Sequence, residues 1–263
     1  MLELLNKKVS LRISIPINSK KDNITYSLNY GKINYNNALI GAYILDKNIP
    51  IKDYSGYVIA IIINSHKVTQ IVLSQTSNYT NKEIIEKIYF KEKTIMLNVI
   101  RPQNFKSHYV HPFPFIYDTN CQKLILGSFP SVKSRELNFY YMHPQNRFWK
   151  VLSKIYSIDF LNLTNEAKRK KLLELHISLY DTITSCDISN SSDSSISDVT
   201  YINMKDLPQI KAIYCNGAKS YNLFIKKYPE YKKMVFKMPS TSPANAKCSL
   251  NDLIKSWEII KNQ

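Results

Sequence analysis

The residues best suited to chemistry lie in one stretch, residues 124–149, which read LILGSFPSVKSRELNFYYMHPQNRFW. An apolar strand, Leu124–Leu126, runs directly into a polar turn that begins at Gly127. A tyrosine pair follows, and a His-Pro-Gln-Asn segment then opens a predicted helix. Amides, hydroxyls and aromatic rings beside the end of a strand are typical of the ligand-binding edge of an α/β sheet.

Polar side chains also follow the other strands predicted in this half of the chain. Asp181, the pair Asn216-Gly217 and the loop 239–246 (PSTSPANA) each come directly after a strand. Because the carboxyl ends of parallel strands meet at one sheet edge, we expect these groups to lie together. They contain no Cys–His pair, no Ser–His–Asp set and no glycine-rich phosphate loop. Such groups suit a flat, uncharged heterocycle, stacked by aromatic rings and bonded along its edge by amides.

Each of these residues also has a structural explanation when it is taken alone. Phe129 is a plausible core residue, Asp181 a plausible turn cap and Asn216 a plausible helix start. The predicted convergence of these residues on one edge is the observation that favours a binding site over the separate structural explanations.

The elements that would position this site alternate between strand and helix after residue 111. The predicted strands are 123–127, 177–181, 211–215 and 234–238, and the predicted helices are 146–156, 166–175, 217–228 and 249–261. This alternation predicts an α/β domain of three layers, α/β/α, with a four-stranded, mainly parallel sheet. The Ser/Asp-rich stretch 184–199 is expected to be a long polar loop, either a flexible linker or part of the site.

The first hundred residues are mostly β in pattern. The predicted strands are 9–15, 26–33, 41–45, 57–63 and 70–73, and a helix should follow Thr80, whose capping box includes Glu83. Many short strands with one helix predict a small barrel-like domain. We therefore expect an N-terminal domain over 1–103, a linker at about 101–111 and a second domain over 111–263.

The chain has 263 residues, 44% of them hydrophobic, so it can form a real core. Its formal charge of +16 favours a polyanionic partner such as nucleic acid. The charge divides equally, +8 in residues 1–110 and +8 in residues 111–263, which weakens any argument from a single basic patch. AT-rich coding, which adds lysine and asparagine, is the alternative explanation.

The four cysteines, Cys121, Cys186, Cys215 and Cys248, include no CxxC pair and none lies near a histidine at metal-ligand spacing. We expect reduced thiols, with no metal site and no cofactor. The longest apolar run, residues 57–63, is too short to cross a membrane, and the N-terminus lacks the pattern of a signal peptide. A cytoplasmic protein with no membrane partner is therefore the expectation.

Six motifs in order resemble the hypoxanthine-DNA glycosylase family of the uracil-DNA glycosylase superfamily, over about residues 111–260. They are GSFPS, YYMHPQNRFW, LYDTITSCD, SSDSSI, NGAKSY and PSTSPANA. The resemblance implies a DNA repair enzyme without a cofactor, which flips a deaminated base, hypoxanthine above all, out of double-stranded DNA and hydrolyses its N-glycosidic bond. Two alternatives stay open: a non-catalytic nucleic-acid-binding protein that kept the fold, and a glycosylase that prefers uracil.

The resemblance also implies roles for particular residues. Ser128 and Phe129 occupy the place where several relatives carry a catalytic Asn or Asp, and Met238 stands where some carry a histidine. In the resembled family an asparagine in the HPxN segment is the expected catalytic residue. This implies that Asn146 positions water or sugar. The expected base pocket comprises Gly127, Ser128, Phe129, Tyr140, Tyr141, Asp181 and Asn216, with the aromatic rings stacking the base. The expected DNA-binding residues are Pro130, Ser131, His143, Ser240, Thr241, Ser242, Pro243 and Asn245, although His143 has a structural explanation too.

The N-terminal half is similar, more weakly, to a divergent inorganic-pyrophosphatase-like barrel, through YSLNYGKI, GAYIL and YSGYVIAII. Active pyrophosphatases hold several Mg²⁺ ions with clustered aspartates, because hard cations need charged oxygens. This half contains only Asp22, Asp46 and Asp53. We therefore expect a catalytically inactive module that clamps DNA, binds a partner or supports the second domain.

Overall fold

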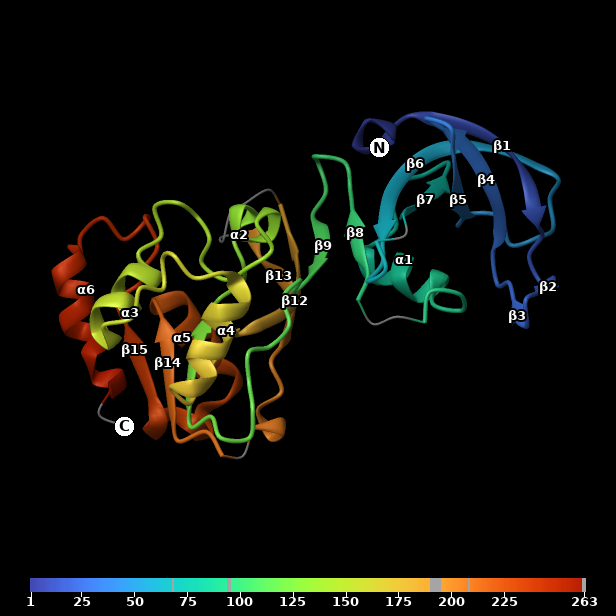
Figure 1. Ribbon diagram of the computed structural model, residues 1–263. Coiled ribbons are helices and arrows are strands. Elements are labelled where there is room, and N and C mark those ends of the chain that lie inside the picture. Colours follow the sequence, from blue (N-terminus) through green and yellow to red (C-terminus); the bar gives the residue numbers. More distant parts are fainter. Residues whose placement is uncertain (68, 94–95, 190–194, 208, 262–263) are drawn as a thin grey trace. The chain divides into compact units, whose positions relative to one another are not determined.

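A computed structural model describes residues 1–67, 69–93, 96–189, 195–207 and 209–261 (Figure 1). The chain forms two compact units. Met1–Val110 and Ser185–Val199 form the first, called the barrel unit below, and His111–Thr184 and Thr200–Gln263 form the second, called the sheet unit. The barrel unit is therefore built from two separate parts of the sequence.

Five strands of the barrel unit close on themselves. They are β1 (Lys8–Ile15), β4 (Asn29–Tyr35), β5 (Ala38–Ile44), β7 (Thr69–Ser74) and β6 (Asp53–Ile63), in that order. Closure occurs because β1 pairs antiparallel with both β4 and β6, which confirms the barrel that the sequence predicts. Smaller elements are η1 (Leu2–Leu4), β2 (Lys20–Lys21) and β3 (Ile24–Thr25).

The one α-helix of this unit among the described residues, α1 (Asn81–Ile88), begins where the sequence predicts. The Thr80 hydroxyl accepts a hydrogen bond from the Glu83 backbone N–H at 3.2 Å, and the Glu83 carboxylate accepts one from the Thr80 N–H at 2.7 Å. The backbone bond and the Thr80 hydroxyl lower the pKa of Glu83. Ile84 and Ile88 of this helix are buried against the barrel core.

Two predictions about the connecting segments are wrong. The expected linker at 101–111 contains β9 (Ser107–Val110), and the expected loop at 184–199 contains β12 (Ile183–Ile188) and β13 (Ser197–Tyr201). With β8 (Asn98–Ile100), these strands continue the sheet of the barrel unit, and β9 pairs antiparallel with β12. Residues 190–194 of that stretch, including part of the SSDSSI motif, lie outside the described residues.

A buried carboxylate explains why this Ser/Asp-rich stretch can be a strand. Asp187 of β12 contacts His108 Nδ1 at 2.7 Å and accepts a hydrogen bond from Asn81 Nδ2 at 2.7 Å. Both carboxylate oxygens are thereby paired, which offsets the cost of removing the charge from water. Cys186 and Ile188, which are also buried, anchor the same strand.

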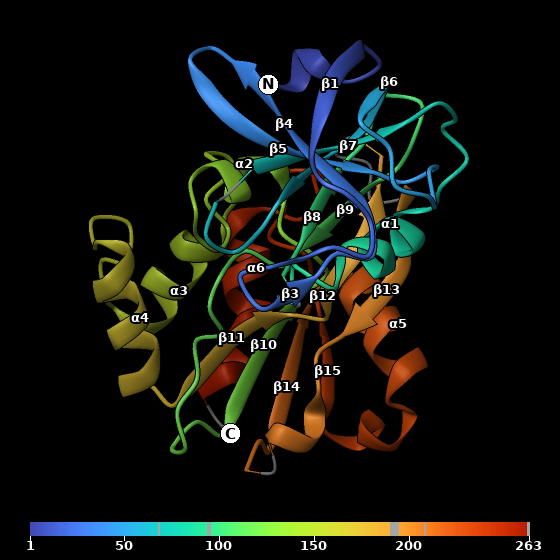
Figure 2. The ribbon, with the colours of Figure 1, turned by 90° about the vertical axis from the view of Figure 1, so that its right-hand side faces the viewer.

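The sheet unit contains the parallel four-stranded sheet that the sequence predicts. Its strands, in order, are β11 (Ile177–Asp181), β10 (Lys123–Gly127), β14 (Ala212–Asn216) and β15 (Val235–Met238), and every neighbouring pair is parallel (Figure 2). In the register, Gly127 lies opposite Asp181 and Asn216 opposite Met238. The last residues of the strands therefore end side by side.

Helices pack on the sheet according to the alternation of its side chains. Ile125 and Tyr214 share a core with α3 and α6, whereas Leu124, Leu126 and Ile213 share another with Phe224 of α5. The helices of this unit are α2 (Val132–Glu136), α3 (Phe148–Tyr156), α4 (Asn165–Glu174), α5 (Ala218–Lys227) and α6 (Leu250–Trp257), with short 3₁₀ segments η3 (Met204–Asp206), η4 (Pro229–Met234) and η5 (Glu258–Lys261). Helix α2, which is only five residues long, was not among the helices predicted from the sequence.

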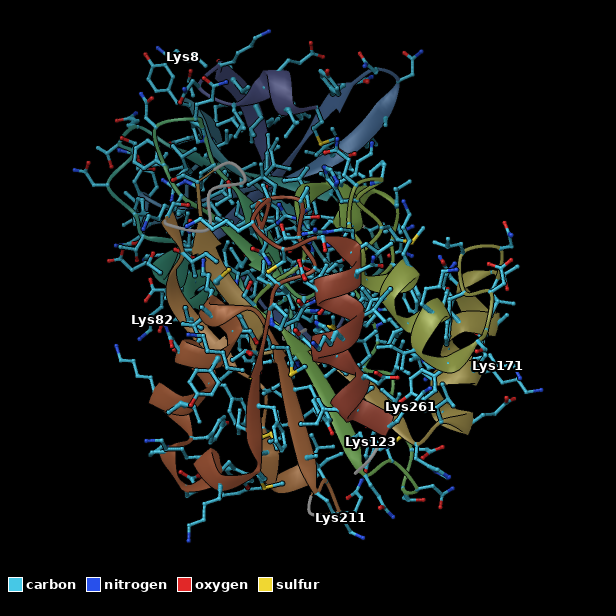
Figure 3. All side chains as sticks on the ribbon, turned by 90° about the vertical axis from the view of Figure 1, so that its left-hand side faces the viewer. Lys8, Lys82, Lys123, Lys171, Lys211 and Lys261 are labelled. Carbon is cyan, nitrogen blue, oxygen red and sulfur yellow. The ribbon has the colours of Figure 1, made fainter. Side chains whose placement is uncertain are left out.

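Charge is distributed over the outside of both units. The lysines labelled in Figure 3 belong to both units, in keeping with the even division of charge along the sequence. Lys8 and Lys82 lie in the barrel unit, and Lys123, Lys171, Lys211 and Lys261 lie in the sheet unit. No helix within the described ranges is long and apolar enough to span a membrane. The same residues contain no group of three or more His, Cys, Asp or Glu side chains placed to hold a metal ion.

Candidate active site at the carboxyl edge of the parallel sheet

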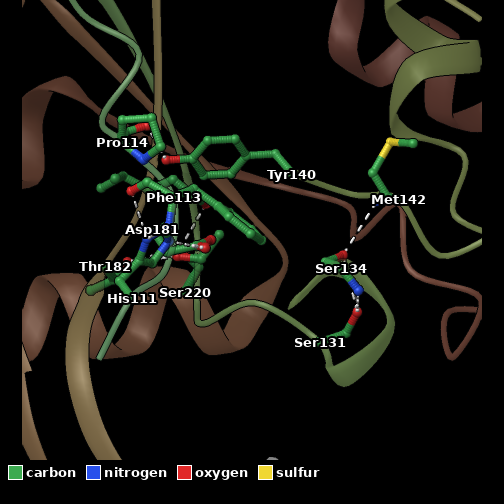
Figure 4. Close-up of polar contacts among 12 residues, drawn as sticks. His111, Phe113, Pro114, Ser131, Ser134, Tyr140, Met142, Asp181, Thr182 and Ser220 are labelled. Carbon is green, nitrogen blue, oxygen red and sulfur yellow. Dashed lines mark hydrogen bonds and ion pairs between the residues drawn. The ribbon is translucent and has the colours of Figure 1, made fainter. Parts of the chain in front are cut away.

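The carboxyl edge of the sheet brings Gly127, Asp181 and Asn216 together, as expected for parallel strands. Gly127 is required by this arrangement, because a Cβ atom at that position would lie 2.0 Å from Asp181 Oδ1. Two hydroxyls fix the carbonyl of Gly127: Thr182 Oγ1 donates to it at 3.0 Å and Ser220 Oγ at 2.9 Å (Figure 4). The turn after β10 is thus held rigidly against its neighbours.

Asp181 is paired with a histidine that is not among the site residues predicted from the sequence. His111 Nε2 lies 2.9 Å from Asp181 Oδ2, and both side chains are buried (Figure 4). The imidazole is surrounded by rings, with the Tyr180 ring centroid 4.3 Å away and that of Phe113 5.3 Å away. The only sequence signal was the HPFPFIYD segment at the start of the glycosylase-like region.

Asn216, Thr241 and Asn146 form a continuous hydrogen-bonded chain. Asn216 Oδ1 accepts from the Thr241 backbone N–H at 2.9 Å, and Asn216 Nδ2 donates to Thr241 Oγ1 at 2.9 Å. Thr241 Oγ1 in turn donates to Asn146 Oδ1 at 3.0 Å. This chain joins the end of β14, the loop after β15 and the segment before α3, so three distant parts of the sequence are tied to one another.

This chain orients the Asn146 side chain so that its oxygen is hydrogen-bonded within the protein and its amide nitrogen is available to a ligand. Its Oδ1 accepts from both Thr241 Oγ1 and the backbone N–H of Phe148, each at 3.0 Å, so both lone pairs are used. The Phe148 N–H can only donate, which fixes which end of the amide is the oxygen. No residue in the described part of the chain accepts a hydrogen bond from Asn146 Nδ2. Asn146 therefore offers N–H donors to a ligand.

The two tyrosines differ in their surroundings. Tyr140 is 2% exposed, and its hydroxyl donates to the carbonyl of Pro114 at 3.1 Å (Figure 4). Tyr141 has a left-handed backbone, with φ of 55°, and its ring packs on Phe148 with centroids 4.1 Å apart. Tyr140 is thus buried in the core and Tyr141 is half-buried against Phe148, and base stacking by either ring stays a prediction. Phe129 is 8% exposed, and base stacking stays a prediction for it.

Several residues expected to bind DNA also make local contacts that shape the site. Pro130 and Thr241 are buried, and their contact with DNA stays a prediction. Ser131 caps α2 by accepting from the Ser134 N–H at 3.2 Å, and His143 Nδ1 accepts from the Gln145 N–H at 3.2 Å. Ser128, placed in the base pocket, is half-buried, and its carbonyl accepts from the Ile183 N–H at 3.1 Å.

No protein-family model matches the sequence, but named relatives do. A hypoxanthine DNA glycosylase of Methanosarcina acetivorans is 30% identical over 154 residues, which cover 56% of this chain and 95% of the relative. The chain belongs to the hypoxanthine DNA glycosylase family. The hypoxanthine DNA glycosylase of Methanosarcina barkeri is 32% identical over 112 residues, 41% of this chain and 71% of that protein. The family resemblance carried by the six motifs is thus confirmed.

A solved structure is also similar to this glycosylase. The solution structure of a candidate uracil DNA glycosylase from Methanosarcina acetivorans is 30% identical in sequence. The match covers 57% of this chain and 95% of that chain, with a TM-score of 0.48.

The loop after β15 of this glycosylase is organised by an arginine that is not among the site residues predicted from the sequence. The Arg147 guanidinium donates to the carbonyls of Ser242 at 3.0 Å, of Asn245 at 2.8 Å and of Cys248. Asn245 Nδ2 donates to the Ser240 carbonyl at 2.8 Å, which closes the loop from the other side. Pro243 at its tip is exposed. A rigid loop with an exposed tip is a suitable contact for a DNA strand.

Thr241 offers a test of the hydrogen-bonded chain. Thr241→Val removes the hydroxyl with little change of shape, so Asn146 Oδ1 loses one of its two donors. We expect the single-turnover rate of base release to fall about 10- to 100-fold, because a small misplacement of a reacting group has that effect. Thr200→Val, on the exposed face of β13, is the matched control and should leave the rate unchanged. Equal rates for both variants would show that the hydroxyl does not position Asn146.

Proposed function

We propose that this glycosylase removes hypoxanthine from deoxyinosine in double-stranded DNA by flipping the nucleotide and hydrolysing its N-glycosidic bond. Family membership supplies the reaction class, a hydrolase acting on DNA, and both relatives carry the name hypoxanthine DNA glycosylase. The observation that carries the proposal is the free amide Nδ2 of Asn146, held at the sheet edge by Thr241 and the Phe148 N–H.

A donor of this kind matches the demands of the reaction. Cleavage of the glycosidic bond builds positive charge on the sugar and negative charge on the departing base. A preorganised N–H donor stabilises the negative charge as it develops, and it needs no reorganisation at the moment of reaction. An amide can do this without a change of protonation state. We therefore assign Asn146 the stabilisation of the departing base, rather than the activation of water by its oxygen.

Two positions at this edge of the sheet supply no free imidazole acid. Met238, where some relatives carry a histidine, is buried at the end of β15. His111 is buried and committed to Asp181. The deaminated DNA strand would be held by the exposed tip of the loop 239–246, helped by the positive charge of the chain. Ser240, Ser242, Pro243 and Asn245 remain the predicted contacts.

We further propose that the N-terminal module, predicted over residues 1–103, does not hydrolyse pyrophosphate. Both carboxylate oxygens of Asp46 serve the fold: Oδ1 accepts from the Tyr54 hydroxyl at 2.6 Å, and Oδ2 accepts from the Gln75 N–H at 2.7 Å. An aspartate so engaged is a poor Mg²⁺ ligand. Support of the glycosylase, DNA clamping and partner binding stay open for this module.

An alkali-cleavage assay tests the proposal. End-labelled duplexes that each carry one inosine, uracil or xanthine are incubated with the protein in EDTA and then treated with alkali, which breaks the strand at abasic sites. We expect scission at inosine. Scission mainly at uracil would favour the alternative glycosylase. Binding to all duplexes without scission would favour a non-catalytic DNA-binding protein and overturn the proposal.

A further inference from the structure

Two buried polar atoms of the site face the same point above Gly127. A Cβ atom built on Gly127 would lie 2.0 Å from Asp181 Oδ1 and 2.9 Å from the Tyr141 hydroxyl oxygen. The carboxylate oxygen and the phenol oxygen are therefore neighbours, at the end of β10 and beside the amide of Asn216. The other carboxylate oxygen of Asp181, Oδ2, is paired with His111 Nε2.

Tyr141 presents a proton at this point. Its hydroxyl is buried, and no residue in the described ranges makes a hydrogen bond of good geometry with it. Burial raises the pKa of Tyr141 well above its usual value, the charge of Asp181 raises it further, and the nearby Asn216 amide opposes the shift. The phenol is therefore neutral, so it can donate. A buried unpaired hydroxyl is costly, and so is the left-handed backbone of Tyr141.

Asp181 presents an acceptor beside this donor. His111 holds one carboxylate oxygen from the buried side, at 2.9 Å, and so fixes the orientation of the group. The other oxygen, Oδ1, is the one that lies next to the Tyr141 hydroxyl. A ligand that meets this pair must present an N–H to Asp181 and an adjacent carbonyl oxygen to Tyr141.

We propose that Asp181 and Tyr141 together read the –NH–C(=O)– edge of the flipped base, and that this pair determines which bases the glycosylase accepts. The inference rests on the proposed function and specifies its substrate class. Deamination of adenine turns ring nitrogen N1 from an acceptor into a donor and replaces the amino group by a carbonyl. Adenine would place its N1 lone pair against the carboxylate and its amino group against the phenol proton, so both contacts would be lost.

The same edge occurs in other deaminated bases. Uracil and xanthine both carry a ring N–H beside a carbonyl, so the hydrogen bonds of Asp181 and Tyr141 alone do not exclude them. Discrimination between these bases and hypoxanthine therefore depends on the size of the base. Because Asp181 and the Tyr141 hydroxyl are buried in the free protein, the base reaches them only when the side chains that cover them move.

Substrate analogues separate reading of this edge from a structural role. Three duplexes are compared, each with one modified nucleoside. The first carries deoxyinosine, and the second carries 1-methyldeoxyinosine, which lacks the N–H. The third carries the deoxynucleoside of purine, which lacks both the N–H and the carbonyl. We expect the wild-type single-turnover rate to fall at least about 100-fold from inosine to 1-methylinosine, as for loss of a specific buried hydrogen bond. Tyr141→Phe should lower the single-turnover rate on the inosine duplex about 100-fold and change the rate on the purine duplex less than about threefold.

Tyr156→Phe is the matched control, since the Tyr156 hydroxyl bonds only to the carbonyl of Ile260 at 3.5 Å in the described structure. It should leave both rates unchanged. A Tyr141→Phe variant that slows both substrates equally, or neither, overturns the inference, and so does equal cleavage of inosine and 1-methylinosine by the wild type. Failure of the wild type to cleave inosine at all would instead overturn the proposed function.

Discussion

Replacing Asn146 by alanine is expected to lower the single-turnover rate of hypoxanthine release about 100- to 1,000-fold, the cost of removing one preorganised donor from a site of developing charge. The binding of DNA should change little, because the role proposed for Asn146 is donation to the departing base and to no phosphate. The measurement is a single-turnover time course on an inosine duplex, with affinity measured separately on an uncleaved duplex.

Two further variants sharpen this expectation. Asn146→Asp keeps the shape but replaces the donor by oxygen, so it should be as slow as alanine at neutral pH. Asn162→Ala, in an exposed turn where Asn162 bonds to Asp159, is the matched control and should keep the full rate. If Asn146→Ala cleaves at the wild-type rate, the catalytic assignment is wrong.

Gly127→Ala should damage both the stability and the activity of the sheet unit. The added methyl group would lie 2.0 Å from Asp181 Oδ1, a distance that real Cβ contacts do not show, so the carboxylate or the strand end must move. Crowding of this kind costs about 1–3 kcal/mol of unfolding free energy. We also expect the glycosylase rate to fall at least about 100-fold, because the displaced groups belong to the site. Denaturant unfolding and single-turnover kinetics measure the two effects.

The physical cause can be checked with a double variant. Asp181→Ala removes the atom that the new methyl group would strike, so Gly127→Ala should cost much less stability in that background than in the wild type. Such non-additivity is expected only for residues in contact. Fully additive losses would show that the methyl group acts through some other contact, and would contradict the placement of Asp181 over Gly127.

The sequence predicted the sheet of this glycosylase well, because its strands carry strong local signals. Residues 123–127 and 177–181 are short segments with mainly apolar residues, and the structure has strands with those limits. Thr80 and Glu83 likewise mark a helix start through a purely local hydrogen-bond pattern. Strand ends in a parallel sheet then bring Gly127 and the other edge residues together by topology alone.

The features that the sequence did not predict depend on distant partners. β12 is rich in polar residues, and its carboxylate is acceptable there only because His108 and Asn81, far away in the sequence, pair with it. His111 is a site residue only through Asp181, and Arg147 only through carbonyls about 100 residues later. Nothing local to either residue indicates these contacts.

The tyrosine pair shows the same limit in a different way. Tyr140 and Tyr141 are adjacent and identical residues, so the sequence cannot distinguish them, and both were predicted to stack on a base. The left-handed backbone at Tyr141 sends its hydroxyl to the end of β10, whereas the hydroxyl of Tyr140 reaches Pro114. A positive φ at a tyrosine is rare and has no signature in the sequence, so the buried donor could be recognised only in the structure.

The most direct test of the central claim is identification of the reaction product. A duplex with one deoxyinosine is incubated with the wild-type protein in EDTA, and free base and abasic sites are quantified, the former by mass spectrometry. We predict free hypoxanthine and abasic sites in equal amounts, on a strand that stays unbroken until alkali is added, with both products strongly reduced for Asn146→Ala. A strand broken at inosine without free hypoxanthine, or no release of base from DNA that is fully bound, would contradict the account.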